Sequence, residues 1–171
     1  MIDQITCWFL LIFGSLYAII HGLLAVGTKR LFRPNQNGIP HSVSVIVAAR
    51  NEEKNIAPLL ESLTAQNYPA EKFEIIIVND RSIDSTAAIV ETFQKGSANI
   101  RLLTIEANTT DMPNKKNALR SGITEAKNDI LVFTDADCVA GKGWLNSISD
   151  AFTEDIGVVA GYSPYGKENT S

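Results

Sequence analysis

Asp135 and Asp137, two aspartates separated by one residue, are the side chains in this sequence best suited to metal chemistry. They follow Ile130–Thr134 (ILVFT), an apolar run typical of a buried strand. Carboxylate oxygens suit Mg²⁺ or Mn²⁺, and such a cation takes further ligands from water and from substrate phosphates. The pair therefore predicts a divalent-cation site at which the metal acts as a Lewis acid on a leaving diphosphate. The alternative is a polar loop that binds no metal.

Polar and charged residues also follow two earlier apolar runs. Arg50 and Glu52 come after Val43–Ala49 (VSVIVAA), and Asp80 comes after Glu74–Asn79 (EIIIVN). Glu52 stands close enough to the strand end to face a ligand. Asp80 either accepts hydrogen bonds from a nucleoside or caps the next turn. Arg50 either neutralises these acids or reaches a phosphate.

Lys115 and Lys116 open a predicted helix, Asn114–Ala126. Because the N-terminal end of a helix attracts anions, one of these lysines is suited to pairing with a diphosphate. The alternative is a solvated basic pair on the helix surface. The turn after Val43–Ala49 contains no glycine, which excludes both a dinucleotide fingerprint and a Walker loop.

Short apolar runs alternate with helical patterns along most of the chain. Strands are expected at Val43–Ala49, Glu74–Asn79, Ile100–Ile105, Ile130–Thr134 and Gly157–Ala160. Helices are expected from about Asn55 to Gln66, after a cap at Ser82 or Asp84, at Asn114–Ala126 and at Trp144–Phe152. This alternation predicts an α/β fold with a mostly parallel sheet and helices on both faces. Ligands of such sheets bind at the carboxyl ends of the strands, where the strand order reverses.

The N-terminal region is apolar enough to cross a membrane. Ile5–Gly27 contains no Asp, Glu, Lys or Arg and would span roughly 34 Å as a helix, against about 30 Å of hydrocarbon in a bilayer. Lys29, Arg30 and Arg33 follow it, which by the positive-inside rule holds that end in the cytoplasm. We therefore predict a transmembrane signal-anchor helix over residues 1–27, with the rest of the chain cytoplasmic. A secretory signal is the alternative.

The composition limits the remaining classes. The 171 residues carry 15 Lys and Arg against 19 Asp and Glu, a net charge of −4, so no basic surplus exists for binding nucleic acid. Two cysteines cannot form a disulfide framework, which favours a reducing compartment. The predicted organisation is the anchor, a linker over residues 28–40 and one domain over residues 41–171.

Four segments, in their order along the chain, resemble a family 2 glycosyltransferase. They are Val43–Ile56 (VSVIVAARNEEKNI), Ile76–Thr86 (IIVNDRSIDST), Lys115–Leu119 (KKNAL) and Phe133–Asp137 (FTDAD). The resemblance covers about residues 43–162. It implies a GT-A (Rossmann-like) fold that binds a nucleotide-activated sugar and inverts its anomeric centre.

The resemblance also implies roles on the nucleoside side of the site. Ala48 and Glu52 would line the nucleoside pocket, and Asp80 would bind the base or the ribose. Two neighbours depart from the family pattern. Asn79 stands where many members have Asp, and Arg81 stands where Gly or Ser is frequent.

The remaining implied roles concern the diphosphate. Lys115 would face the diphosphate, Asp137 would be the main metal ligand, and Asp135 would contact the ribose or the metal shell. Arg50 completes the predicted donor site. The implied cofactor is Mg²⁺ or Mn²⁺.

We therefore expect a membrane-anchored inverting glycosyltransferase (a hexosyltransferase). It would transfer a sugar from a nucleotide-diphosphate sugar, UDP-sugars being favoured over GDP-sugars, to a membrane-proximal lipid or polysaccharide acceptor. Nothing after Asp137 is a convincing general base, so we expect that base beyond Ser171. The chain would then be the amino-terminal part of a larger enzyme and inactive by itself. The alternative is a non-catalytic, membrane-tethered nucleotide-binding or interaction module.

Overall fold

The computed structural model describes residues 3–31, 40–106, 113–153 and 155–161, with the side chains of residues 28–31 left out. The chain divides into two compact units, Met1–Gln36 and Asn37–Ser171. Each unit is described by itself below.

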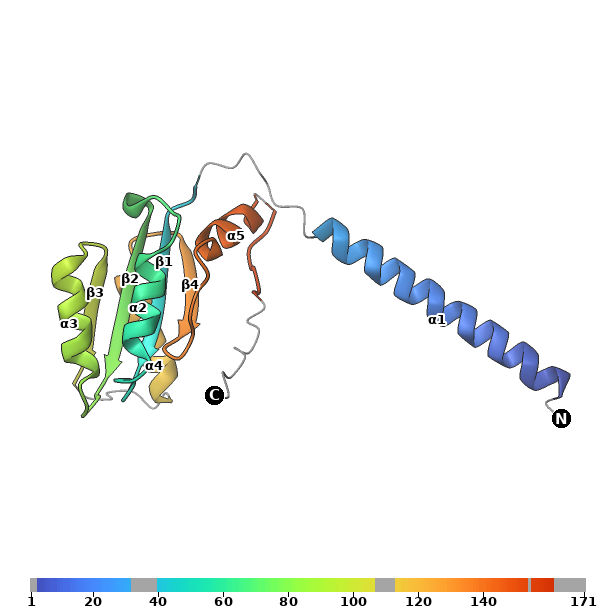
Figure 1. Cartoon of the computed structure of the whole chain (residues 1–171), viewed down its shortest axis with the longest axis horizontal. Coiled ribbons are helices and arrows are strands. Elements are labelled where there is room, and N and C mark those ends of the chain that lie inside the picture. Colours follow the sequence, from blue (N-terminus) through green and yellow to red (C-terminus); the bar gives the residue numbers. More distant parts are fainter. Residues whose placement is uncertain (1–2, 32–39, 107–112, 154, 162–171) are drawn as a thin grey trace, which may run out of the picture. The chain divides into compact units, whose positions relative to one another are not determined.

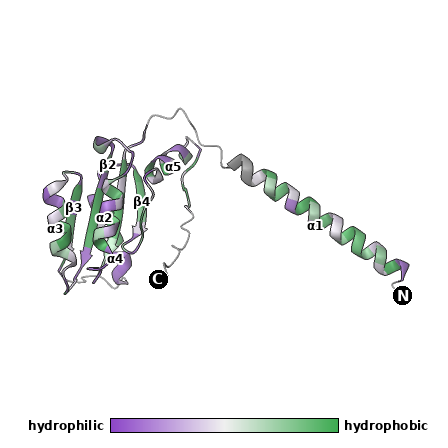
Figure 2. Ribbon diagram, viewed as in Figure 1, coloured by the Kyte–Doolittle hydropathy of each residue, from purple (hydrophilic) through white to green (hydrophobic). Residues whose placement is uncertain are grey.

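The described residues of the first unit contain one helix, α1 (Gln4–Leu31). Asp3 caps its start, since the Asp3 Oδ1 accepts a hydrogen bond from the backbone N–H of Thr6 at 2.7 Å. Residues Gln4–Gly27 are long and apolar enough to cross a membrane (Figure 2), which fits both the predicted anchor and a secretory signal. The helix continues four residues past the predicted anchor boundary. The side chains of Lys29 and Arg30, and all of Arg33, lie outside the described residues, so the orientation stays a prediction.

The second unit is built on a parallel sheet of four strands (Figure 1). The strands are β1 (Val43–Ala49), β2 (Phe73–Asp80), β3 (Ile100–Ile105) and β4 (Ile130–Asp135), in the spatial order β3-β2-β1-β4. Every pairing is parallel, as the sequence predicts. β2 lies beside β1 and β3 lies beside β2, so the first three strands follow one another across the sheet in one direction. β4 instead pairs with the opposite edge of β1. The strand order therefore reverses between β1 and β4, the place where α/β sheets bind ligands.

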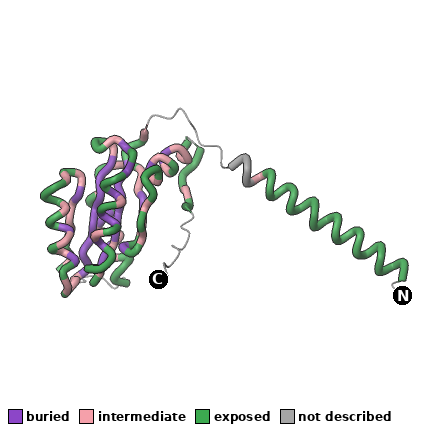
Figure 3. The backbone as a smooth tube through the Cα atoms, viewed as in Figure 1, coloured by how far each residue is buried: buried purple, intermediate pink, exposed green. Residues whose placement is uncertain are grey.

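Helices cover both faces of the sheet, which confirms the predicted architecture. On one face α2 (Ile56–Thr64), α3 (Thr86–Gly96) and α5 (Trp144–Ala151) pack against one set of strand residues. On the other face α4 (Asn114–Glu125) packs against the alternate set. A short 3₁₀ helix, η1 (Ala70–Lys72), precedes β2. Successive strand residues point to opposite faces, and because both faces are covered, β2 is buried along its whole length (Figure 3).

A buried carboxylate ties the amino ends of the strands to the end of α4. Glu74 Oε1 accepts hydrogen bonds from the Ser44 hydroxyl and from the Lys127 backbone N–H, both at 2.7 Å. Its other oxygen, Oε2, lies 3.4 Å from the Arg101 guanidinium. A buried charge is tolerated only with such partners. This network fixes the turn between α4 and β4, far along the strands from their carboxyl ends.

One predicted element is absent from the described residues. Gly157–Ala160 forms no strand, which corrects the sequence prediction. The β-branched pair there favours extended backbone, but a strand also needs a neighbour with which to pair. Val158 is 85% exposed, and within the described chain β4 pairs with β1 alone. The other differences are at element ends. The helices α2, α4 and α5 stop one or two residues early, β2 gains one residue at each end, and β4 gains Asp135. The N-cap of α3 is Ser85, not the predicted Ser82 or Asp84, although Asp84 Oδ1 accepts a hydrogen bond from the Thr86 N–H at 3.0 Å.

The close approach of α4 to the sheet depends on Gly122. A Cβ at this position would lie 2.5 Å from Ile46 Cγ2 and 3.1 Å from Val78 Cγ2, and both of those side chains are fully buried. We expect Gly122→Ala to lower the free energy of unfolding of the full chain by about 1–3 kcal/mol, because the added methyl overpacks this contact. Denaturant unfolding followed by circular dichroism in detergent would measure it.

The matched control is Gly96→Ala at the end of α3, where a Cβ would meet nothing within 4 Å. It should change the free energy of unfolding by less than about 0.5 kcal/mol. Equal effects at Gly122 and Gly96 would show that the close packing of α4 contributes nothing.

Candidate functional site

A pocket of about 370 Å³ opens at the carboxyl ends of β1, β2 and β4, beside the start of α4. It brings together all seven residues that the sequence predicts for the site: Ala48, Arg50, Glu52, Asp80, Lys115, Asp135 and Asp137. The strand register explains this meeting. Ala48 of β1 pairs with Val78 of β2 on one side and with Asp135 of β4 on the other, so residues that follow these positions share one edge of the sheet.

Sequence reasoning missed part of the lining. Ala49, Asn114, Ala118 and Ala136 also face the pocket. Ala118 is buried, and with the half-buried Ala48 it gives the pocket small side chains on its floor. Asn114 is the first residue of α4. Ala49, Asn114 and Ala136 could have been found because each lies next to a predicted site residue, and Ala118 because it lies one helical turn after Lys115.

Lys115 and Asp135 form an exposed ion pair across the pocket. Lys115 Nζ lies 2.7 Å from Asp135 Oδ1, and each side chain is about three-fifths exposed. The hydrogen bond to Asp135 raises the pKa of Lys115, and the negative charges of Asp135 and Asp137 add to this effect. The Lys115 side chain is therefore a protonated ammonium at neutral pH. An ion pair this exposed adds little stability. Both groups can therefore exchange partners when a ligand arrives.

Asp80 is the buried carboxylate of the site. It ends β2 with its side chain only 6% exposed, and Arg81 Nε donates to its Oδ1 at 2.8 Å. Arg81 has a φ of 56° and Asn51, in the loop after β1, has a φ of 58°. These are the two non-glycine residues with left-handed backbone among those described, and both lie in loops beside the pocket. The sequence does not reveal either conformation.

Hydrogen bonds to the loop after β2 and to the first residue of α3 hold the loop after β1 in place. The Asn51 N–H donates to Ser82 Oγ at 3.0 Å, and Asn51 Oδ1 accepts from the N–H of Ile83 at 2.9 Å. The Glu52 N–H donates to Thr86 Oγ1 at 2.8 Å. We call these three bonds the loop clamp. It fixes the backbone of Glu52 relative to the end of β2, and hence relative to Asp80.

The donor set of the pocket fits a hard divalent cation. Asp135 and Asp137 both line it and offer carboxylate oxygens. The described residues contain no group of three or more His, Cys, Asp or Glu placed to hold a metal. Two protein carboxylates are the set that Mg²⁺ uses when water and substrate phosphates complete its coordination. The residues therefore suit a cation that binds together with a phosphate ligand.

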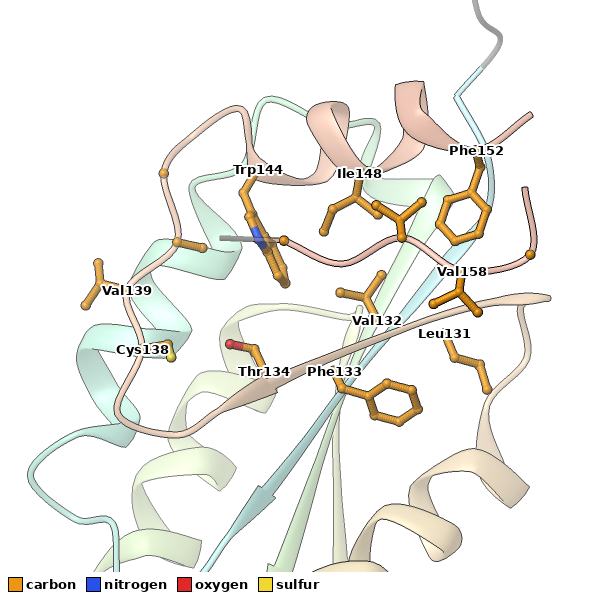
Figure 4. Close-up of a pocket in the computed structure, with 15 residues that line it drawn as sticks. Leu131, Val132, Phe133, Thr134, Cys138, Val139, Trp144, Ile148, Phe152 and Val158 are labelled. Atoms are coloured by element: carbon orange, nitrogen blue, oxygen red, sulfur yellow. The ribbon is translucent and has the colours of Figure 1, made fainter. Parts of the chain in front are cut away.

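A second, larger pocket of about 700 Å³ lies between β4, α5 and residues 157–161 (Figure 4). Trp144 and Ile148 of α5 point toward Val132 of β4 across it. Its lining is apolar apart from Thr134 and Cys138, and none of the described residues that form it carries a charge. The charged side chains that a phosphate ligand would need therefore line the smaller pocket.

The loop clamp makes a stability prediction at Thr86. Its side chain is fully buried and accepts from the Glu52 N–H while donating to Asp84 Oδ1 at 2.6 Å. Thr86→Val keeps the shape but leaves the Glu52 N–H unpaired, so we expect a loss of about 1–3 kcal/mol in the free energy of unfolding. Thermal or denaturant unfolding of the full chain measures this loss.

Thr92→Val on the same helix is the control. The Thr92 hydroxyl bonds only the Ala88 carbonyl on the exposed surface of α3, so its loss should fall within about 0.5 kcal/mol of zero. Should Thr86→Val prove equally neutral, the clamp does not hold the loop.

Comparison with known proteins gives a consistent family assignment for residues 44–171, which match the model of the family described as "Glycosyl transferase family 2". Glycosyltransferase AglE of Haloferax volcanii is 33% identical over 103 residues, which are 60% of this chain and 33% of AglE. Beta-monoglucosyldiacylglycerol synthase of Trichormus variabilis is 30% identical over 142 residues, 82% of this chain and 30% of the synthase.

Among solved structures, Staphylococcus aureus TarS 1–349 in complex with UDP-GlcNAc superposes with a TM-score of 0.53 at 33% identity. The match covers 63% of this chain and 30% of that one. This chain spans about a third of the length of AglE and of the synthase.

Proposed function

Because this chain belongs to glycosyl transferase family 2, we propose that it binds a nucleotide-diphosphate sugar, a UDP-sugar in preference, in the pocket at the ends of β1, β2 and β4. The observation that carries the proposal is the meeting of seven residues, which come from four separate segments of the sequence, in one pocket. The UDP-GlcNAc bound by the similar TarS 1–349 supports the donor class. The reaction would be an inverting transfer of a hexose.

The nucleoside half of the donor belongs between β1 and β2. Asp80 is an acceptor for N–H or O–H groups, because an ionised carboxylate offers only lone pairs. Ala48 is small enough for a flat ring to lie against β1. Glu52, which the loop clamp holds at the rim, can accept from a ribose hydroxyl.

The diphosphate half belongs between α4 and β4. Lys115 stands in the first turn of α4, where a positive charge is unfavourable toward the helix dipole and the turn itself holds no acidic residue. A bound diphosphate would offset the unfavourable interaction between the Lys115 charge and the helix dipole. Asp135 and Asp137 would hold Mg²⁺ or Mn²⁺, which supplies charge neutralisation for the leaving diphosphate. Arg50 adds a second cationic side chain to the same pocket.

We further propose that the acceptor is a lipid or a glycan at a membrane surface. Two observations support this: α1 is long and apolar enough to anchor the chain, and the similar synthase is named for a diacylglycerol product. The general base would be a carboxylate on the acceptor side that takes the proton of the acceptor hydroxyl as the sugar carbon is attacked. It stays a prediction for residues beyond Ser171.

The proposed metal ligand is tested by Asp137→Asn, which keeps the shape of the side chain and removes its charge. Calorimetric titration of the full chain in detergent with UDP, with and without Mn²⁺, should show Mn²⁺-dependent affinity in the wild type. The variant should lose at least about tenfold of that affinity. Asp129→Asn, an exposed aspartate before the opposite end of β4, is the control and should bind as the wild type does. Metal-independent binding that is unchanged in Asp137→Asn would remove the metal assignment.

Lys115→Gln should act in opposite directions on the two ligands. Losing the ammonium weakens UDP binding by about 10- to 100-fold, the value of one charge-assisted hydrogen bond. The same change frees Asp135 Oδ1, so Mn²⁺ alone should bind more tightly, as followed by the paramagnetic resonance signal of free Mn²⁺. Lys116→Gln, the exposed neighbour that does not line the pocket, should change neither. A loss of affinity for both ligands would contradict the partner exchange.

A further inference from the structure

The loop that follows β4 carries Asp137, the proposed metal ligand, and continues to the start of α5. Asp137 is exposed, and the one hydrogen bond that its carboxylate receives from the described residues comes from the Cys138 thiol, at 3.9 Å. A thiol is a weak donor. The carboxylate of Asp135, by contrast, has the Lys115 ammonium at 2.7 Å. The position of the Asp137 carboxylate therefore depends on the backbone that carries it.

Two features hold that backbone from the side of β4. Ala136, between the two aspartates, is buried and belongs to the apolar core on the α2 face of the sheet. The Cys138 N–H donates to the Asp135 carbonyl at 3.2 Å, which closes a tight turn over residues 135–138. This turn holds the backbone of Asp137 at one end only, so the chain beyond Cys138 needs a support of its own.

That support comes from α2 and from the turn that follows it. Ser62 Oγ accepts from the Ala140 N–H at 3.0 Å. Gln66, one helical turn later, donates through Nε2 to the Gly141 carbonyl at 2.8 Å and accepts through Oε1 from the Leu145 N–H at 3.1 Å. We call these three bonds the α2 contacts. They join the loop to a helix whose apolar side chains are buried in the core.

Gln66 makes two of the three α2 contacts. The residue is 8% exposed, and its Nε2 also donates to the Ser62 carbonyl at 3.0 Å. A buried amide is tolerated only when its polar atoms are paired. Its partners Gly141 and Leu145 lie 75 and 79 positions further along the chain. Because these bonds are long-range, they fix where the loop lies relative to the core.

We propose that Gln66 is a positioning residue for the metal, because through the α2 contacts it holds the loop after β4 with the Asp137 carboxylate in the pocket. This inference rests on the proposed function, since it needs a cation at Asp137. A metal ligand that must be ordered before it binds loses affinity, and residues that support metal ligands typically contribute about 10- to 100-fold to metal affinity. The competing interpretation is that Gln66 only stabilises the fold.

The test is Gln66→Met, which replaces the amide with an apolar group of similar length in the full chain in detergent. Calorimetry gives the dissociation constant of UDP without and with Mn²⁺, and the ratio of the two measures the contribution of the metal. We expect this ratio to fall about tenfold, while UDP binding without Mn²⁺ changes by less than about twofold. At saturating UDP and Mn²⁺, the paramagnetic resonance lines of the bound metal should broaden, because a loosely held ligand gives a spread of coordination geometries.

Tyr68→Phe is the matched control. Tyr68 lies two residues after Gln66, is also buried, and donates to the carbonyl of His41, which precedes β1, at 2.6 Å. Each variant should lower the melting temperature by about 3–10 °C, since each loses a hydrogen bond from a buried side chain. Only Gln66→Met should change the Mn²⁺ ratio and the resonance lines. An equal fall of the ratio in Tyr68→Phe would show that any loss of stability loosens the metal ligand, which overturns the proposal.

The outcomes separate this inference from the function on which it rests. Should the wild-type chain bind UDP no more tightly with Mn²⁺ than without it, the proposed metal site fails and the inference falls with it. Should the wild type show the Mn²⁺ dependence and Gln66→Met retain it in full, only the role of Gln66 is lost. If Gln66→Met does not fold, Ser62→Ala removes the bond to Ala140 alone and should lower the ratio about threefold. An unchanged ratio in that variant also overturns the proposal.

Discussion

The parallel register of β1 with its two neighbours is the constraint on which the rest of the second unit depends. The strand is buried on both faces, and its next-to-last residue, Ala48, lies level with Val78 on one side and with Asp135 on the other. A slip of one residue in either ladder would turn every side chain of that strand to the opposite face. The same alignment that fills the core therefore sets the height at which the charged residues emerge. In this fold the strand register therefore determines both the packing of the core and the geometry of the site.

The pocket at the carboxyl edge of the sheet holds more acidic than basic side chains, so its carboxylates need partners. Four carboxylates line the pocket, those of Glu52, Asp80, Asp135 and Asp137, against the cations of Arg50 and Lys115. The buried Asp80 pairs with Arg81, the half-buried Glu52 accepts from Asn55 Nδ2, and the exposed Asp135 pairs with Lys115. This division matches the two halves of the proposed donor. The neutral base needs a rigid acceptor, whereas the diphosphate needs charges that can rearrange around it.

Much of this could be predicted from the sequence, and the exceptions have physical causes. The continuous apolar run of β2 and the helical spacing in α2 leave little choice of structure, because each element must bury those residues. Most of the site residues could be predicted because they lie at or just after the carboxyl ends of strands, and Lys115 because it opens a helix. Gly157–Ala160 has the composition of a strand, but pairing is a property of two segments and cannot be read from one. The left-handed backbone of Asn51 and Arg81, and the contact of Arg81 with Asp80, depend on where two loops meet, and no local pattern encodes that meeting.

The order of the strands also determines the sequence in which the parts of this site assemble during protein synthesis. β1, β2 and β3 form from successive βαβ units, so the part of the pocket that carries Glu52 and Asp80 can assemble soon after its residues are synthesised. β4 must instead return across most of the domain to pair with β1, a long-range closure that is slow and entropically unfavourable. Asp135 and Asp137 arrive with it. A nascent chain would thus form the side of the pocket proposed for the base before the side proposed for the diphosphate, and full affinity for the proposed donor would come only after β4 has paired with β1.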